Sequence, residues 1–409
     1  MSAIWLSVLV GGCSGVIYDH YSAEDDPEDQ DLVTLVLNIG LVSPTRGAAD
    51  NDRELMHSLR IILLDAETDG QVEYNAHIDF TTGTDSFGYH FIRTKPGKKK
   101  IFLIANEESI ASVNGDRNTI TTLLDELEAQ EDDGLRGMSS VDAEKTLKAV
   151  WFTPGNYDGA NGWIPLSSSY AFEIKESELT ADNRRVEKTF YLVHAATKFE
   201  FEFLNYRTSL VTINSLSISS ISDNMYLMAK FEGTLAEEKM GPAPYNNLYW
   251  IDWLKKVSDE TTDSPTLPGN KSVNELYGWI REYDLPSSAH FPRNIVVDSN
   301  PSYSVSAVRG DGVTPGRLEG GDSESILIYC PESKYGVDEK GDQKYTFSVS
   351  LTDANKSSSE PQEFTFENLK TLFRNTHVIV IVTLGENGTV NITYTVCPWD
   401  EKATAIDFY

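Results

Sequence analysis

The sequence predicts a mostly β protein made of two β-sandwich domains with a few short helices. Its 409 residues exceed what one hydrophobic core usually supports, so two cores are expected. Segments in which apolar and polar side chains alternate dominate the chain, and this period of two is typical of half-buried strands. The clearest example is Phe199, Phe201 and Phe203, which alternate with charged residues and indicate where the second core begins.

Three strands and one helix are predicted in the first half of the chain. Residues 33–41 carry an apolar side chain at every second position, which predicts a strand with one buried face. Residues 59–64 and 101–105 are largely apolar on both faces, as in central strands that are covered from two sides. One amphipathic helix should pack against this domain, because apolar residues recur at helical spacing at Ile120, Leu123, Leu124 and Leu127.

The second half is predicted to end in a β-hairpin. Residues 378–384 are continuously apolar, and residues 390–396 alternate after the turn sequence Gly385-Glu386-Asn387-Gly388. An insert rich in Trp and Tyr, residues 245–283, predicts short helices that decorate this domain. The polar residues 182–185 lie between two strand-rich regions, so we expect domains at 47–184 and 185–409.

The first residues are typical of an exported protein. Residues 3–10 are an apolar stretch of signal-peptide length, too short to span a bilayer. They run into Val10-Gly11-Gly12-Cys13, which looks like the lipobox of bacterial lipoproteins, so residues 1–13 are interpreted as a signal and Cys13 as the lipidated residue. The alternative is a buried strand with a chance Gly-Gly-Cys. In the lipoprotein interpretation, residues 14–46 hold an acidic tether and the first strand.

Composition argues against several function classes. The formal net charge is −29, with 34 Lys and Arg against 63 Asp and Glu, which disfavours a nucleic-acid groove. The seven histidines are scattered singly, without the spacing of metal ligands. Neither a Gly-x-Ser-x-Gly elbow nor a phosphate-binding Gly-rich loop occurs. The sequence therefore predicts that the protein is not an enzyme and that it binds neither a cofactor nor a metal.

Two further motifs have structural interpretations. Cys330 and Cys397 are too few for a disulfide scaffold, and two separate buried thiols are slightly favoured over a bridge between them. Arg309-Gly310-Asp311 spells the integrin tripeptide, but Gly-Asp-Gly is ordinary turn chemistry, so a turn is predicted.

Three stretches of the chain carry a resemblance to a known family. They are Leu59-Arg60-Ile61-Ile62-Leu63-Leu64-Asp65, then Gly97-Lys98-Lys99-Lys100-Ile101-Phe102-Leu103-Ile104-Ala105-Asn106, and finally Phe373-Arg374-Asn375-Thr376-His377-Val378-Ile379-Val380-Ile381-Val382 followed by Pro398-Trp399. Together with the lipobox, they resemble the fimbrillin family, the lipoprotein precursors of type V pili in Gram-negative bacteria.

This resemblance implies a fold and a way of assembling. Family members have two sandwich domains of transthyretin-like, Greek-key topology, and they polymerise by strand exchange after an Arg-specific protease removes the first strand. The matching site here is Thr45-Arg46-Gly47-Ala48, with cleavage between Arg46 and Gly47, although Arg46 could instead be a solvated turn residue. Losing a strand exposes an apolar groove and unpaired backbone groups, which an incoming strand satisfies. The expected donor follows Trp399, where Ile406 and Phe408 alternate with Asp407.

The expected partners are identical or related pilin subunits, the outer membrane through lipid on Cys13, and the Arg-specific protease, all at the cell surface. Two alternatives stay open within the family: a fimbrial anchor that keeps its lipid, and a tip adhesin. A third, from another class, is a surface lipoprotein that binds glycans through Trp250, Trp253 and Trp279.

Overall fold

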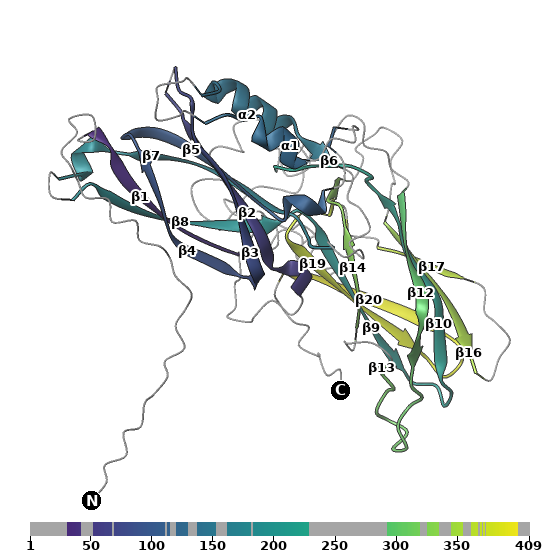
Figure 1. The fold of residues 1–409 in the computed structure, drawn as a ribbon. Coiled ribbons are helices and arrows are strands. Elements are labelled where there is room, and N and C mark those ends of the chain that lie inside the picture. The colour runs from purple at the N-terminus through teal and green to yellow at the C-terminus, as the bar shows by residue number, and fades with distance from the viewer. Residues whose placement is uncertain are drawn as a thin grey trace, which may run out of the picture.

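The computed structural model describes residues 31–41, 52–67, 69–110, 113–114, 120–129, 137–152, 162–180, 183–228, 293–319, 325–334, 345–354, 361–366, 369, 371–372 and 374–399. These residues are mostly in β-strands, and Figure 1 shows two sandwiches that follow one another along the long axis. No helix within these ranges is long and apolar enough to cross a bilayer. The predicted fold class is confirmed.

The N-terminal sandwich has two sheets that are joined at one end. One sheet has the order β3-β2-β5-β7 and the other β8-β1-β4. They connect because β7 and β8 pair only at Leu166–His194 and Ser167–Val193 before they diverge. The strands are β1 (Val33–Leu41), β2 (Met56–Asp65), β3 (Val72–Thr84), β4 (Ser86–Thr94), β5 (Gly97–Ala105), β7 (Leu166–Ile174) and β8 (Arg185–His194).

Strands β2 and β5 are covered on both faces, as their apolar pattern predicted. On one face, Ile61 of β2 and Leu103 of β5 lie in the core between the two sheets. On the other face, Ile62 and Phe102 pack beneath a helical layer. This double burial accounts for the nearly continuous apolar sequence of both strands.

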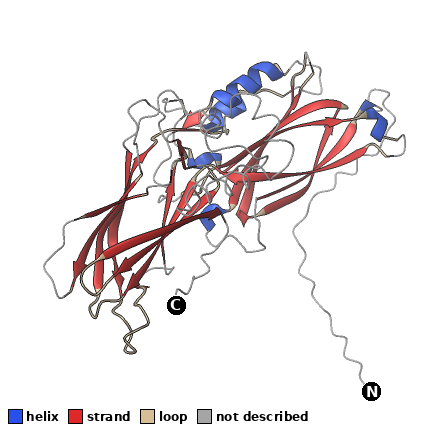
Figure 2. Ribbon diagram, turned by 180° about the vertical axis from the view of Figure 1, so that it is seen from behind, coloured by secondary structure: helices blue, strands red, loops and turns tan. Residues whose placement is uncertain are grey.

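The helical layer consists of α1 (Ile120–Asp125) and α2 (Ser140–Ala149). Figure 2 shows both helices on the same side of the molecule. The buried Ile120 and Leu124 of α1 confirm the predicted amphipathic helix. Helix α2 was not predicted, because its buried residues are mostly small and its sequence has little apolar periodicity. The short strands β6 (Trp151–Phe152) and β11 (Met225–Tyr226) pair beside this layer.

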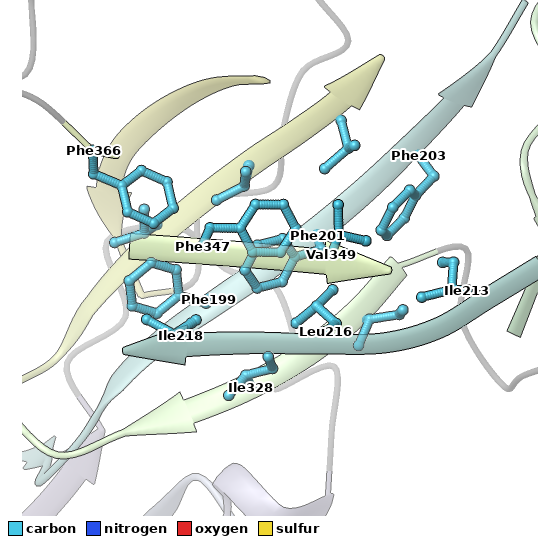
Figure 3. Close-up of a cluster of buried hydrophobic side chains, with 14 of the residues drawn as sticks. Phe199, Phe201, Phe203, Ile213, Leu216, Ile218, Ile328, Phe347, Val349 and Phe366 are labelled. Carbon is cyan, nitrogen blue, oxygen red and sulfur yellow. The ribbon is translucent and has the colours of Figure 1, made fainter. Parts of the chain in front are cut away.

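The C-terminal sandwich also has two main sheets, of order β13-β12-β10-β16-β17 and β14-β9-β19-β20. Its core contains Phe199, Phe201 and Phe203 from β9, which pack opposite Phe347 of β16 (Figure 3). The strands are β9 (Thr197–Asn205), β10 (Val211–Ile221), β12 (Arg293–Val305), β13 (Leu318–Glu319), β14 (Ser325–Cys330), β16 (Thr346–Asp353), β17 (Gln362–Thr365), β19 (Thr376–Leu384) and β20 (Val390–Pro398). A small ladder joins β15 (Ser333–Lys334) and β18 (Thr371–Leu372).

The predicted terminal hairpin is present as β19 and β20, which pair from Thr376–Pro398 to Leu384–Val390. Its turn closes through a hydrogen bond from Gly388 N to Gly385 O (3.1 Å). Gly388 has φ 83°, a left-handed conformation that glycine adopts without a steric penalty.

Strand pairing moves the division between the two sandwiches. The boundary expected at residues 182–185 falls in the polar connection between β7 and β8, and β8 pairs with β1 and β7 of the first sandwich. The chain crosses to the second sandwich between His194, where β8 ends, and Thr197, where β9 begins. A polar connection within a hairpin has the same composition as a linker, so the sequence did not distinguish the two.

Candidate assembly site

Strand β1 lies inside its sheet, with a neighbour on each side. Residues 34–41 pair one to one and in parallel with residues 185–192 of β8. On its other edge, β1 pairs antiparallel with β4, from Val33–Thr94 to Gly40–Ser86. The predicted strand 33–41 is confirmed with the same bounds. We call the flanking residues of β4 and β8 the β1 seat.

The inward face of β1 is fully buried. Val33, Leu35 and Leu37 have no exposed surface, and Ile39 is 2% exposed. All four pack into the core of the N-terminal sandwich. Each buried aliphatic side chain contributes on the order of 1.5–3 kcal/mol of hydrophobic free energy. Strand β1 is therefore a major part of this core, although it precedes the rest of the domain in sequence.

The outward face of β1 makes polar and irregular contacts. Asn38 donates from Nδ2 to Glu187 Oε1 (2.7 Å) and accepts at Oδ1 from Tyr89 N (3.3 Å). The β1–β4 register shifts between Leu37 and Ile39, and Tyr89 opposite this shift has φ 58°. Asn38 thus ties β1 to both neighbours at a β-bulge.

His90 lies beneath β1 as the cross-strand partner of Leu37. Its Nε2 is 2.8 Å from the hydroxyl of Tyr74, and its ring contacts Phe87. Burial lowers the pKa of His90 below its usual value of 6.5, because an apolar environment disfavours the charged ring. With β1 in place, the environment of His90 in the β1 seat therefore favours the neutral form of the ring.

A cluster around Glu54 joins the two sandwiches. Glu54 belongs to the short helix η2 (Asp52–Glu54), which precedes β2, and is 1% exposed. Its carboxylate accepts from Trp399 Nε1 (2.7 Å) and Tyr329 OH (2.8 Å) and forms an ion pair with Lys198 Nζ (3.3 Å). All three donors belong to the C-terminal sandwich. We call these four residues with His194 the Glu54 cluster.

His194, the last residue of β8, completes this cluster from the N-terminal side. Its ring stacks on Trp399 with a centroid distance of 4.1 Å, and its Nε2 lies 2.9 Å from Glu54 O. Lys198 Nζ lies 5.0 Å from the centroid of the Trp399 ring, within the range of a cation–π interaction. Trp399, at the end of the described chain, is thus fixed at the junction and is fully buried.

Arg374 forms a second connection across the junction. Its guanidinium pairs with the buried Glu332 and donates to Leu227 O (2.8 Å) and Ser167 Oγ (3.2 Å). Ser167 lies on β7, while Leu227 packs in the core beneath the helical layer. Arg374 and Trp399 both occur in the third of the stretches that carry the family resemblance, and their role in joining the domains was not apparent from the sequence.

Asn106 gives the second of those stretches a structural role. It ends β5 in a left-handed conformation, with φ 59°. Its side chain accepts from His57 N (2.7 Å) and donates to Leu55 O and Ile164 O (both 2.8 Å). A short amide side chain in this conformation can bridge two other backbone segments to the end of β5, which accounts for an Asn directly after an apolar strand.

Most of the site residues predicted from the sequence lie outside the described residues. These are Cys13, Arg46, Gly47, Ile406 and Phe408, together with Trp250, Trp253 and Trp279 of the aromatic insert. What the structure describes is the environment on either side of them. Strand β1 and η2 flank the segment that holds Arg46, and Trp399 precedes the segment that holds Ile406 and Phe408.

The prediction of two separate buried thiols is confirmed. Cys330 and Cys397 are both buried, and no disulfide joins them. They lie on β14 and β20, the two outer strands of one sheet, with β9 and β19 between them. Neighbouring strands are about 4.8 Å apart, so three such steps exceed the reach of a disulfide.

The Arg309-Gly310-Asp311 sequence forms a turn, as predicted. The Asp311 carboxylate accepts from the side chain of Thr314 (2.5 Å) and from the backbone N–H groups of Thr314 and Val313 (both 2.9 Å). These hydrogen bonds lower the pKa of Asp311 to about 2. Both carboxylate oxygens are engaged within the loop, so the tripeptide acts here as a turn-stabilising sequence.

Among the described residues, His77, Asp79 and Glu108 are close enough together to be considered as metal ligands. Glu108 lies 2.6 Å from His77 Nε2, whereas Asp79 lies 3.8 Å from Nδ1, the opposite ring nitrogen. The two carboxylates therefore approach opposite nitrogens of the ring, and one ion can bind only one of these nitrogens.

The described residues define a two-domain β-sandwich protein whose first strand is inserted between two later strands. No family model matches the chain, and no curated protein sequence matches it. Among solved structures, the tip fimbrial protein Mfa3 from Porphyromonas gingivalis, with a C-terminal truncation, is similar with a TM-score of 0.50 at 12% identity; the match covers 90% of this chain and 100% of that chain. A fimbrilin (FimA) from Porphyromonas gingivalis W83 matches with a TM-score of 0.45 at 10% identity, over 90% of this chain and 98% of that chain.

At 12% identity, the match to Mfa3 shows a common fold. The fold implied by the resemblance to the fimbrillin family is thereby confirmed.

Proposed function

We propose that this chain is a structural subunit of a surface pilus. It is exported as a lipoprotein acylated at Cys13, processed after Arg46, and polymerised by strand exchange to support adhesion. Its partners are identical or related pilin subunits, the outer membrane through the lipid, and an Arg-specific surface protease. The fold shared with the tip fimbrial protein Mfa3 supports a fimbrial role.

The position of β1 is the observation that carries this proposal. Its full length lies between β4 and β8, yet only residues 42–51 connect it to η2. Glu54 of η2 is bound by residues of the C-terminal sandwich, so the chain that follows the connection is anchored independently of β1. Cleavage within the connection would free β1 and leave the rest of the N-terminal sandwich joined to its partner domain. The vacated site would expose buried apolar surface and unpaired backbone groups, which favour an incoming strand.

The decisive experiment combines processing with assembly. We expect the full-length precursor to remain monomeric and to form high-mass polymers after cleavage by an Arg-specific protease. Mass spectrometry should find Gly47 at the new N-terminus, and an Arg46→Ala precursor should neither be cleaved there nor polymerise. Wild-type protein that is cleaved after Arg46 but stays monomeric contradicts the proposal.

Lipidation is tested separately. Cells given a clickable fatty acid should label the wild-type protein but not Cys13→Ala. A mature surface protein that carries lipid and still begins at Cys13 would favour the anchor role. The glycan-binding alternative requires binding by the monomer that is lost when Trp250 and Trp253 are replaced by Ala.

A further inference from the structure

Lys99 is a buried lysine at one end of the N-terminal sandwich. It is the middle residue of the run Lys98-Lys99-Lys100 at the start of β5, and it is 1% exposed, whereas Lys98 is an exposed residue. Side chains alternate along a strand, so Lys99 points the same way as Ile101, which lies in the core between the two sheets. The Lys99 amine is therefore held at the edge of this core, away from bulk solvent.

Two carboxylates from other strands meet this amine. Asp65 at the end of β2 is the direct cross-strand partner of Lys99, so the two side chains share one face of the sheet. Asp65 Oδ1 lies 3.7 Å from Lys99 Nζ, and Glu73 Oε1 lies 2.8 Å from it. Glu73 reaches the same place because the β2–β3 register shifts between Leu63 and Leu64, and such a bulge redirects the side chain of the extra residue. The three side chains therefore converge from three strands.

Each carboxylate has a further hydrogen bond that fixes its orientation. Glu73 Oε2 accepts from Thr94 Oγ1 (2.7 Å), and Thr94 is a buried residue of β4, in the other sheet of the sandwich. Asp65 Oδ1 accepts from Glu67 N (3.2 Å). The exposed fraction of the side chain falls from 28% at Asp65 to 12% at Glu73 and 0% at Lys99. Glu73 thus lies beside the amine, and a backbone N–H group is directed at the Asp65 carboxylate.

We propose that Lys99 and Asp65 react to form an intramolecular amide, an isopeptide bond, with Glu73 transferring the protons. The Lys99 ammonium gives a proton to Glu73, and its nitrogen attacks Cγ of Asp65. A C–N bond forms, the bond from Cγ to Oδ2 breaks, and Oδ2 leaves as water with two protons that Glu73 has carried from the nitrogen. One ammonium and one carboxylate are consumed, one amide and one water are produced, and Glu73 ends as the carboxylate that it was at the start.

The observed contacts supply what this reaction needs. Glu73 Oε1 is within hydrogen-bond distance of the amine whose protons it accepts. The Glu67 N–H group stabilises the negative charge that develops on Asp65 Oδ1 when the nitrogen adds to Cγ. Reacting atoms held about 3–3.5 Å apart reach effective concentrations of roughly 10⁵–10⁸ M, which offset the unfavourable loss of water. The amide also removes two opposite charges from a buried place, where charges are costly to keep.

The bond would fasten a part of the sandwich that includes β4. Strands β3 and β4 both lie between Asp65 and Lys99 in the sequence, so the bond closes them into a covalent loop that starts on β2 and ends on β5. Such a loop reduces the conformations that the chain can adopt when these strands leave their sheets. Because β4 flanks β1, the bond keeps β4 attached whether or not β1 is present. This inference stands independently of the proposed strand exchange.

Peptide mapping tests the bond directly. The full-length folded protein is purified, then unfolded and digested with trypsin, and the peptides are analysed by mass spectrometry. Trypsin does not cut after an acylated lysine, so we expect residues 61–93 joined to residues 99–100, lighter than the sum of the two peptides by one water molecule. Fragmentation should place the link between Asp65 and Lys99. Wild-type protein that yields residues 61–93 only in the unlinked form overturns the proposal.

Two variants and a control assign the roles. Lys99→Arg keeps a cation but lacks the amine, so it should yield only unlinked residues 61–93. Glu73→Gln can still bond to Thr94 but cannot carry protons, so the linked fraction should fall about tenfold or more. Lys98→Arg is the matched control and should link as fully as wild type. A linked peptide in Lys99→Arg, or unchanged linkage in Glu73→Gln, contradicts these roles. The wild-type map decides the proposal even where a variant fails to fold.

Discussion

At the scale of single residues, the least expected feature is a buried carboxylate at the domain junction. Glu54 is 1% exposed, and its hydrogen bonds come from Trp399 and Tyr329 and its ion pair from Lys198. A buried charge is tolerated only when its partners replace the water that it has lost. Here those partners are supplied by the other sandwich, so the charge on Glu54 is satisfied only when the two sandwiches are joined.

We expect Glu54→Ala to destabilise the precursor by about 3–5 kcal/mol, because it leaves Lys198 buried without its ion pair. Chemical denaturation monitored by Trp fluorescence measures this change in unfolding free energy. Glu178→Ala is the control, since its carboxylate is exposed and pairs only with Lys175 at the surface; its effect should stay within about 0.5 kcal/mol. Equal stability of the two variants would contradict a junction role for Glu54.

His90 should report whether β1 is in its seat. Its pKa is lowered by burial, so the unfolded chain binds a proton more readily than the folded one. The stabilising contribution is therefore complete above the usual histidine pKa of about 6.5 and declines as the pH falls below it. We expect the pKa of His90 to return toward its usual value once β1 is released. Histidine NMR titration of the precursor and of the cleaved, β1-free subunit measures the shift, and identical titrations would exclude it.

At the scale of secondary-structure elements, β1 combines a large buried surface with a link to the later strands through residues 42–51 alone. Its inward side chains belong to the main N-terminal core, and its backbone pairs with strands that are distant in sequence. Both the core packing and the backbone pairing of β1 depend on residues that are distant in the sequence. The strand exchange proposed above would replace these contacts with those of another strand of similar pattern.

Leu35→Ala should therefore affect the precursor and the polymer differently. In the precursor it leaves a cavity in the core, and we expect a loss of about 2–5 kcal/mol in unfolding free energy. If processing at Arg46 removes β1 as proposed, the polymers lack the substituted residue, so their thermal stability should equal that of wild-type polymers. Differential scanning fluorimetry before and after processing makes the comparison. Polymers destabilised as much as the precursor would show that β1 is retained.

At the scale of the whole molecule, the two sandwiches are joined by buried contacts and not only by the chain that connects them. The Glu54 cluster joins them, and Arg374 joins Glu332 to Ser167 and to the carbonyl of Leu227. Only two residues separate β8 from β9. We therefore expect the buried contacts of the Glu54 cluster and of Arg374 to couple the unfolding of the two sandwiches.

We expect the wild-type precursor to unfold in a single calorimetric transition, and Arg374→Met to separate it into two. The variant removes the cation from a buried ion pair and leaves Glu332, which is 1% exposed, without it. Arg317→Met is the control, because Arg317 is partly exposed and its ion pair with Glu202 lies within the C-terminal sandwich. Two transitions already present in the wild-type protein would disprove the coupling.

The sequence by itself determined several of the strands and which of their faces are buried. The alternation in residues 33–41, the double-faced apolar strands β2 and β5, and the terminal hairpin were all predicted, because burial leaves a local periodic pattern. The assembly residues Cys13, Arg46, Gly47, Ile406 and Phe408 stay predictions. Helix α2 was missed because its small buried residues leave little pattern.

Only the tertiary structure decided which strands are partners. That β8 belongs to the first sandwich, that β1 runs parallel to it, and that Glu54 meets Trp399 are contacts between residues far apart in the chain. A periodic pattern specifies that a face is buried but not which surface covers it. Which surface covers a strand depends on contacts between residues that are far apart in the sequence. Those contacts form only when both sandwiches pack together.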